Sequence, residues 1–256
     1  MVKNENVIWV GKEELFVEAK RNMLPAEIVM DIGCGIMPQR YIRPVTHICV
    51  EPFEQYIEVL KQKIQNGADR SYVIYKGLWD DAIKNFPEKS VDTVILTDVI
   101  EHIDKDHALV LLKNTERLAR KQIILFTPLG FIKQEHPDGK DAWGLDGGKW
   151  QEHKSGWLPE DFDSTWKIIA SKEFHETNNI GVRHEKPFGA LWAIKTLDAS
   201  SHNPKREEII RIMSEIIDLN NQRVITWVGT MVRTILKIKN ILSFIIDKSP
   251  IRYVFK

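Results

Sequence analysis

Glycines and carboxylates follow the first apolar runs of the chain at a spacing that suits a nucleotide-like ligand. The apolar run at 27–30 leads directly into residues 31–35, Asp-Ile-Gly-Cys-Gly, and a second run at 47–50 ends at Glu51. Glycines at such a turn let the backbone approach a ligand closely, and a following helix would offer free N–H groups. We therefore expect a cofactor across the carboxyl ends of parallel strands.

Pro38 argues against a pyrophosphate at this turn. The dinucleotide-binding fingerprint has a third glycine three residues after the second, and this position is Pro38. Asp31, two residues before Gly33, instead suits a cofactor that carries an ammonium and a sulfonium, because a carboxylate attracts both cations.

On these residues the chain resembles the class I S-adenosylmethionine-dependent methyltransferases, whose first motif is an acid, any residue, Gly, any residue, Gly. The likeness extends over roughly residues 25–196. It implies that Glu51 accepts hydrogen bonds from the ribose hydroxyls, since two carboxylate oxygens suit a vicinal diol. Met37 departs from the family, which often has another glycine there. The implied S-adenosyl-L-methionine site comprises Asp31, Gly33, Cys34, Gly35, Glu51, Asp80 and Asp98.

Asp80 is included because residues 77–80 follow the third apolar run at 72–75. The family places an acid there that hydrogen-bonds the adenine amino group beside an apolar wall. Asp80 or the adjacent Asp81 could instead be the N-cap of a helix.

The segment at 91–103 resembles the fourth strand of the family and the turn after it. The resemblance implies that Asp98 lies near the methionine end of the cofactor, while Glu101 and His102 face the substrate pocket or cap the helix. Residues at this spacing can also converge on a metal, and a few methyltransferase branches use a Glu-x-x-Glu-His version for a divalent ion. We expect no metal here.

Methyl transfer mainly requires that the acceptor be positioned and water excluded, but a base is useful when the acceptor is a hydroxyl. Residues 151–162 resemble the His-x-Ser-x-Trp and Pro-Glu-Asp stretch of many small-molecule methyltransferases. His153 is therefore expected to line the acceptor pocket, with His102 and then His136 as further candidates. The same stretch is also typical of a capped helix start, with Pro159 in its first turn.

Short apolar runs alternate with stretches of helical periodicity, at 52–65 and 108–119 for example. This pattern predicts repeated βαβ units. After residue 128, six of the fourteen glycines gather at 130–156, which is typical of a lid or binding loop. The predicted fold is α/β: a Rossmann-like, seven-stranded, mostly parallel sheet of the class I methyltransferase type with a helical C-terminal appendage. Its strands are expected at 27–30, 47–50, 72–75, 91–97, 122–126, 166–170 and 190–194, with a hairpin at 177–188.

The composition is that of a globular protein, with 256 residues, 43% hydrophobic and 28% charged. Basic and acidic residues both number 36, so no bulk basicity indicates nucleic acid binding. Cys34 and Cys49 are read as buried thiols of a reducing compartment. Because the charged N-terminus is unlike a signal peptide and no uncharged run would span a membrane, we expect a cytoplasmic protein.

The C-terminal segment carries a different charge from the rest. Residues 204–256 contain ten Lys and Arg against five Asp and Glu, a net charge of +5. An apolar stripe beside these charges predicts a basic amphipathic helix. We expect a methyltransferase domain at 1–200 and an appendage at 201–256. The appendage could lie on the inner face of an anionic membrane, or pack on the body or on a second copy of the chain.

These observations predict methyl transfer from S-adenosyl-L-methionine to a small molecule or to a glycan- or lipid-linked intermediate, at oxygen by preference. One alternative is a non-catalytic relative that acts as an interaction module at the membrane. Another is a nicotinamide oxidoreductase with the same sheet, against which Pro38 argues.

Overall fold

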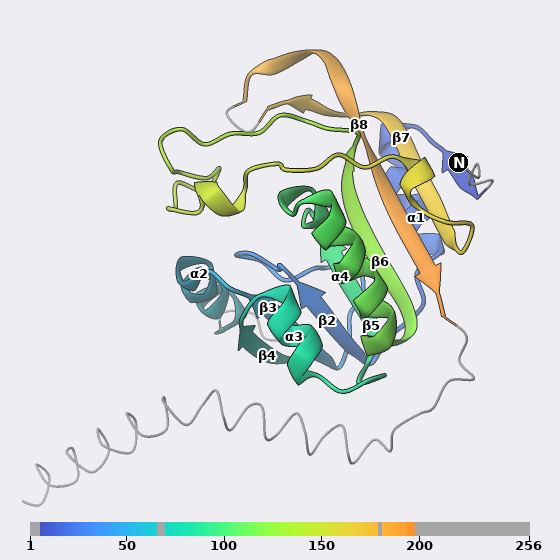
Figure 1. Cartoon of the computed structure of the whole chain (residues 1–256), viewed down its shortest axis with the longest axis vertical. Coiled ribbons are helices and arrows are strands. Elements are labelled where there is room, and N and C mark those ends of the chain that lie inside the picture. Colours follow the sequence, from blue (N-terminus) through green and yellow to red (C-terminus); the bar gives the residue numbers. More distant parts are fainter. Residues whose placement is uncertain (1–5, 66–69, 179–180, 198–256) are drawn as a thin grey trace, which may run out of the picture. The chain divides into compact units, whose positions relative to one another are not determined.

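The computed structural model describes residues 6–65, 70–178 and 181–197, which form an eight-stranded mixed sheet with helices on both faces (Figure 1). The strands are β1 (Val7–Trp9), β2 (Ile28–Ile32), β3 (Thr46–Glu51), β4 (Ser71–Lys76), β5 (Val91–Thr97), β6 (Ala119–Leu129), β7 (Trp166–Thr177) and β8 (Arg183–Thr196). The helices are α1 (Leu15–Arg21), α2 (Glu54–Gln65), α3 (Trp79–Asn85) and α4 (Lys105–Leu118). Short 3-10 turns lie at Lys12–Glu14, Ile100–His102, Gly148–Trp150 and Pro159–Asp161.

The strand order is β1-β7-β8-β6-β5-β2-β3-β4. All neighbours pair in parallel except β8, which is antiparallel to both β6 and β7. The carboxyl ends of β2, β3 and β5 therefore meet at one edge of the sheet, where a ligand site is expected in an open α/β sheet.

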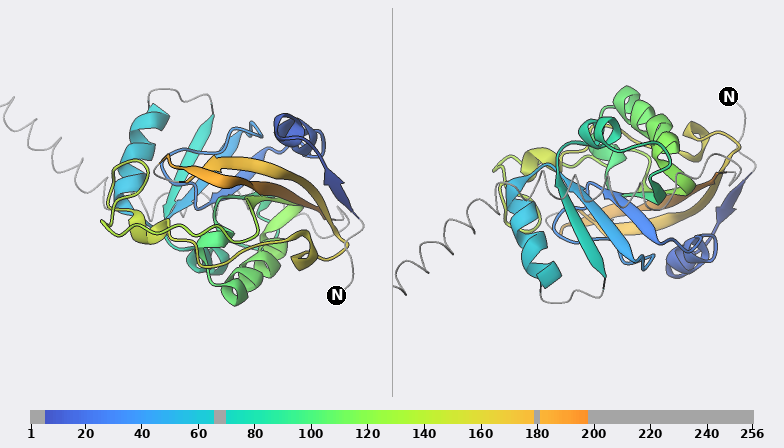
Figure 2. Two further views of the ribbon diagram at one scale, coloured as in Figure 1. Left: turned by 90° about the horizontal axis from the view of Figure 1, so that it is seen from above. Right: turned by 90° about the horizontal axis from the view of Figure 1, so that it is seen from below.

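The helices divide between the two faces of the sheet, as the views from above and below show (Figure 2). α3 and α4 lie together on one face, and α1 and α2 lie on the other. Both faces of the central strands are therefore covered, which is why their sequences are almost continuously apolar. In β5, only Thr97 at the carboxyl end is not fully buried.

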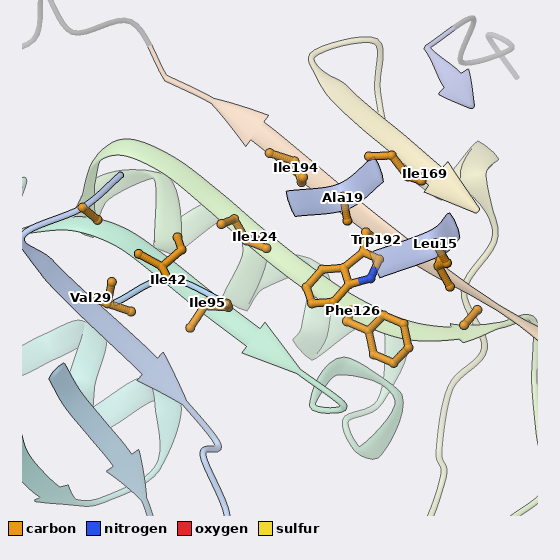
Figure 3. Packing of buried hydrophobic residues seen from close by; sticks show 12 residues of the cluster. Leu15, Ala19, Val29, Ile42, Ile95, Ile124, Phe126, Ile169, Trp192 and Ile194 are labelled. Atoms are coloured by element: carbon orange, nitrogen blue, oxygen red, sulfur yellow. The ribbon is translucent and has the colours of Figure 1, made fainter. Parts of the chain in front are cut away.

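The core beneath α1 joins residues that are far apart in the sequence (Figure 3). Leu15 and Ala19 of α1 pack with Ile124 and Phe126 of β6 and with Trp192 of β8. Complete burial of a side chain such as Leu15 contributes about 1.5–3 kcal/mol. This packing holds β8 beside β6 within the sheet.

The predicted α/β class and mostly parallel sheet are confirmed, but the predicted strand number was wrong. The additional strand is β1, which pairs in parallel with β7 at the edge of the sheet. The two closing strands are also longer than expected, because β7 and β8 extend through most of the segment predicted as a hairpin. The long paired ribbon that results arches over the carboxyl edge of the sheet (Figure 1).

The expected helix directly after the glycine turn does not form. Residues 33–45 are all described and contain no helix. The Gln39 side chain accepts the backbone N–H groups of Tyr41 and Ile42, and donates to the Ile42 carbonyl. These bonds give the backbone N–H and carbonyl groups of this segment hydrogen-bond partners that a helix would otherwise supply. Pro38 and Pro44 also disfavour one, because proline lacks the N–H that a helix interior needs.

None of the described helices is long and apolar enough to cross a membrane. The last residue that the structure describes is Leu197, which lies within the predicted domain of residues 1–200. The predicted appendage at 201–256 lies outside the described residues, so its helix and its surface stay predictions.

Candidate functional site

The turn after β2 requires both of its glycines. Gly33 has φ +69° and Gly35 has φ +58°, in the left-handed region that favours glycine. A Cβ atom at Gly33 would lie 2.8 Å from Cγ2 of Val99, which is closer than carbon atoms approach. The Gly33 N–H donates to the Val50 carbonyl at 2.8 Å, so the turn is also fixed to β3.

Glu51, at the end of β3, lies directly against this turn. One carboxylate oxygen accepts the Gly35 N–H at 2.9 Å, and the other accepts the Phe53 N–H at 2.9 Å. The side chain is only 4% exposed, and its burial raises the pKa to about 7, although the two N–H donors lower it in part. Each oxygen keeps a lone pair, so the carboxylate can still accept hydroxyl donors from a ligand.

Asp31 lies behind the glycine turn rather than on a cavity wall. Its carboxylate is 1% exposed and accepts the Gln39 N–H at 2.8 Å, with His47 Nε2 at 3.2 Å from the same oxygen. The other oxygen has no hydrogen-bond partner among the described residues. We expected Asp31 to contact a ligand ammonium directly, but its side chain lines neither cavity. Asp31 instead accepts the Gln39 N–H and so holds the loop at residue 39.

The Cys34 side chain also points away from the cavities. It packs in a core cluster with Cys49 and Leu60, and the neighbouring thiol of Cys49 together with burial raises its pKa. The prediction of buried thiols fits this placement. Any contact between Cys34 and a cofactor would therefore involve its backbone.

Asp80 is placed on the outer surface of α3. Its carboxylate pairs with Lys84 one helical turn later, at 3.0 Å, and this partner lowers its pKa. The N-cap of α3 is Leu78, so neither acid is the N-cap residue itself; Asp81, the third residue of the helix, accepts the Leu78 N–H at 3.1 Å and so helps to cap the helix. The apolar wall expected in this region is present as Leu78 and Trp79, without Asp80.

Two cavities meet at the carboxyl edge of the sheet. The smaller, of about 260 Å³, is lined by Glu51, Tyr56, residues 77–79 and Trp150. The larger, of about 550 Å³, lies on the other side of the glycine turn and is walled by residues 36–41, part of which replaces the expected helix. Both volumes together suit a cofactor and a small acceptor. The lining residues common to both cavities are Gly33, Gly35, Asp98, His102 and Gln151.

The glycine-rich loop after β6, at residues 130–156, lines both cavities, as expected of a binding loop. We call it the roof loop. It is fixed to α2, because Tyr56 donates a hydrogen bond to Asp141 at 2.6 Å and Gln55 donates to Asp146 at 3.0 Å. Trp143 packs edge-on against Tyr56, with ring centroids 5.3 Å apart. Gly147 lies so close to Tyr56 that a side chain there would collide with it.

Asp98 and Glu101 are adjacent acids at the junction of the cavities. Asp98 follows β5 with φ +53°, a strained value for a residue other than glycine. Its carboxylate is open to the cavities but surrounded by protein, and this desolvation raises its pKa to about 6, although a hydrogen bond with Glu101 lowers it in part. Glu101 is 2% exposed and accepts the Thr127 hydroxyl at 2.9 Å, and its burial and the neighbouring Asp98 raise its pKa.

His102 and His153 face each other beside this acid pair, with ring centroids 5.0 Å apart. His102 Nδ1 lies 3.1 Å from the Glu152 carbonyl, and His153 Nδ1 lies 2.7 Å from the Ile132 carbonyl. Carbonyl oxygens only accept hydrogen bonds, so we assign the proton to Nδ1 and the lone pair to Nε2 in both rings. Burial lowers the pKa of His102 to about 4 and also lowers that of His153, which favours neutral imidazoles. His136 is buried and lines neither cavity.

The stretch that contains His153 is fixed to the turn after β5. Ser155 is buried, and its hydroxyl lies 2.9 Å from the Ile100 carbonyl and accepts the Trp157 ring N–H at 3.0 Å. The Lys154 and Ser155 N–H groups both donate to the Glu101 carbonyl. His153 lines the larger cavity, and Pro159 also begins a short 3-10 turn, so the expected pocket placement and the capped turn are both present.

Other lining residues had no motif in the sequence. Tyr41 comes from the irregular segment after β2, and His175 and His184 come from the extended ribbon of β7 and β8. The glycine-rich segment at 130–156 did indicate a binding loop, and Trp143 and Trp150 line the cavities from it. The sequence could not predict that His175 and His184 line this cavity, because their position depends on how far β7 and β8 pair beyond the rest of the sheet.

The family model described as "Methionine biosynthesis protein MetW" matches residues 15–136. Similar solved structures include TehB from Haemophilus influenzae, at 17% identity and TM-score 0.48, covering 70% of this chain and 61% of that chain. Another is magnesium protoporphyrin IX methyltransferase from Synechocystis PCC 6803, at 14% identity and TM-score 0.43, covering 72% and 77%. A third is a methyltransferase from Archaeoglobus fulgidus, at 15% identity and TM-score 0.44, covering 73% and 95%.

No curated protein sequence matches this chain. The chain spans about three fifths of the length of the TehB structure. The mostly parallel sheet, the glycine turn followed by Glu51, and the family-model match together confirm the resemblance to the class I S-adenosylmethionine-dependent methyltransferases.

Proposed function

We propose that this protein transfers a methyl group from S-adenosyl-L-methionine to a small molecule or to a glycan- or lipid-linked intermediate, at oxygen by preference. The observation that carries the proposal is the junction of two cavities at Gly33, Gly35 and Asp98, one beside Glu51 and the other beside paired histidines. A cofactor and an acceptor in separate cavities that meet at one point would have their reacting atoms brought together.

The residues of the smaller cavity fit a nucleoside cofactor. Glu51 retains acceptor capacity for two hydroxyls, and the backbone at Gly35 has no side chain to block a close approach. Leu78 and Trp79 offer an apolar wall for a base. When bound, S-adenosyl-L-methionine supplies a methyl group activated by its sulfonium.

The larger cavity supports an oxygen acceptor. The acceptor's hydroxyl would lie against His102 and His153, whose Nε2 lone pairs favour loss of its proton. The roof loop and Trp143 would exclude water from the reacting atoms. Arg40 and Lys133 line the outer part of this cavity and suit an acceptor that carries negative charge elsewhere.

The test of the cofactor site is calorimetry of the full chain with S-adenosylhomocysteine. Charge-assisted hydrogen bonds contribute about 1.5–3 kcal/mol each, so the loss of two of them in Glu51→Ala should weaken binding by roughly 10²- to 10⁴-fold. Asp80→Ala, on the outer face of α3, is the matched control and should bind as the wild type does. Equal affinity for wild type and Glu51→Ala would contradict the site.

Turnover is tested separately, by incubating the protein with S-adenosyl-L-methionine and a small-molecule cell extract. Mass spectrometry should then show S-adenosylhomocysteine and a product heavier by one methylene. Binding of the cofactor without formation of S-adenosylhomocysteine in any extract or lipid fraction would favour the non-catalytic interaction module.

A further inference from the structure

We infer that Glu101, His102 and His153 form a binding site for a divalent transition-metal cation. One potential ligand atom of each residue lies within 4.8 Å of the other two. Ligands at about 2.0–2.1 Å from a tetrahedral ion lie about 3.4 Å apart. The three ligand atoms are therefore at most about 1.4 Å farther apart than they would be around such an ion.

Both imidazoles are held as metal-ligating histidines usually are. Their Nδ1 atoms are engaged by the backbone carbonyls of Glu152 and Ile132, which leaves Nε2 free in each ring. A backbone carbonyl on the far nitrogen orients a ligand histidine and fixes its tautomer. Two histidines from segments about fifty residues apart share this arrangement.

The carboxylate is oriented in the same way. Glu101 accepts the Thr127 hydroxyl from β6, and its own backbone carbonyl accepts the N–H groups of Lys154 and Ser155. These bonds connect the turn after β5, strand β6 and the segment of His153 into one rigid unit. A site whose ligands are supported by such outer contacts needs little reorganisation to bind an ion.

The charges at this point also favour a cation. Asp98 and Glu101 are adjacent acids, and within the described part of the chain neither forms an ion pair with a lysine or arginine. The two carboxyl groups share a hydrogen bond, and a divalent ion bound to Glu101 would take the place of its proton, with Asp98 at the side of the ion.

The donor set indicates the kind of cation. Two imidazole nitrogens and a carboxylate suit zinc, manganese, iron or cobalt, whereas magnesium and calcium prefer oxygen ligands alone. His102 and His153 line the larger cavity, so an ion here would keep a position open toward it. Three protein ligands with an open position are the arrangement of catalytic rather than structural metal sites.

The role of the ion rests on the proposed function. An ion at this junction would take an oxygen of the acceptor as a further ligand, which would position it and lower the pKa of a hydroxyl. A nitrogen bound to the ion cannot also accept a proton, so this inference makes His102 and His153 ligands in place of bases.

The experiment is calorimetry of the full chain, purified with EDTA and dialysed, with Zn²⁺, Mn²⁺ and Mg²⁺ as separate titrants. We expect one Zn²⁺ or Mn²⁺ per chain, with Mg²⁺ much weaker. His153→Ala and Glu101→Gln should each lose at least tenfold in affinity. His175→Ala changes a histidine of the same cavity outside the cluster and should bind as the wild type does.

S-adenosylhomocysteine affinity is measured on the same variants and should be retained in His153→Ala, which shows that the variant is folded. Absence of stoichiometric binding, or equal affinity for wild type and His153→Ala, would overturn the metal site. If the metal binds and S-adenosylhomocysteine does not, the proposed function fails while the metal site stands.

Discussion

Replacement of Glu51 by Gln should remove a loss of stability that the wild type shows between pH 5 and pH 8, and should weaken binding of S-adenosylhomocysteine. The pKa of Glu51 is raised from an ordinary value of 4.5 to about 7, mainly by burial. At about 1.4 kcal/mol per pH unit, this shift corresponds to roughly 3 kcal/mol. The ionised carboxylate therefore destabilises the ligand-free fold.

The direction in which stability changes with pH follows from proton binding. Between pH 4.5 and 7 the folded protein holds a proton on Glu51 that the unfolded chain has released, so the free energy of unfolding falls as pH rises through this range. Gln removes the ionisation, but its NH₂ group cannot accept one of the two backbone N–H groups that Glu51 accepts, which lowers the stability of the variant by an amount that does not depend on pH. The stability of Glu51→Gln relative to the wild type should therefore rise by up to roughly 3 kcal/mol between pH 4 and pH 8.

The assay is thermal unfolding at pH 5 and pH 8, with and without S-adenosylhomocysteine. At about 2–4 °C per kcal/mol for a chain of this size, the melting temperature of the variant relative to that of the wild type should rise by roughly 5–10 °C from pH 5 to pH 8 without ligand. The ligand should stabilise only the wild type appreciably, and more at pH 8 than at pH 5. A stability difference that does not change between pH 5 and pH 8, or equal stabilisation of both proteins by the ligand, would refute this reasoning.

Three further predictions concern the turn, the histidines and the C-terminal segment. Gly33→Val should abolish S-adenosylhomocysteine binding in calorimetry, because a Cβ there meets Val99 at 2.8 Å and a valine strains the positive φ; Gly11→Val is the control, because Gly11 has φ −68° and the nearest atom to a new Cβ there is 3.9 Å away. His153→Ala should retain cofactor affinity but lower single-turnover rates by about 10²-fold or more, and an unchanged rate would remove His153 from the reaction. Truncation after Ser201 should abolish sedimentation with anionic liposomes, since residues 223–256 carry seven basic residues and one acid. Loss of self-association on truncation, without liposome binding by the intact chain, would show a packing surface instead.

The sequence predicted the sheet well because buried parallel strands are short, apolar and regularly spaced. The run at 91–97 coincides with β5. The helices α1 and α3 have only seven residues each, too few for a period of 3.6 to be distinguished. β1 is shorter still, and its place is set by pairing with β7, which follows more than 150 residues later.

The candidate site was predicted only where function depends on a local motif. The glycine turn and Glu51 lie together because β2 and β3 are neighbours, and their spacing already indicated this. Asp80 was misplaced because the choice between Asp80 and Asp81 depends on the phase of α3, which Lys84 and the helix start decide. The stretch at 151–162 predicted that His153 lines the pocket, but its pairing with His102 depends on the path of the loop after β6, which the sequence does not specify.

The irregular connection between β2 and β3 also determines the sign of the electric field at the site. A helix beginning after the glycine turn would direct about half a positive charge at the ligand and favour phosphates. Residues 33–45 are not helical, and the acids Asp31, Glu51, Asp98 and Glu101 gather around the same turn. The local potential is therefore dominated by carboxylates. We expect such a site to favour a cationic ligand over a polyanion such as ATP, and this preference follows in part from the absence of a helix N-terminus among residues 33–45.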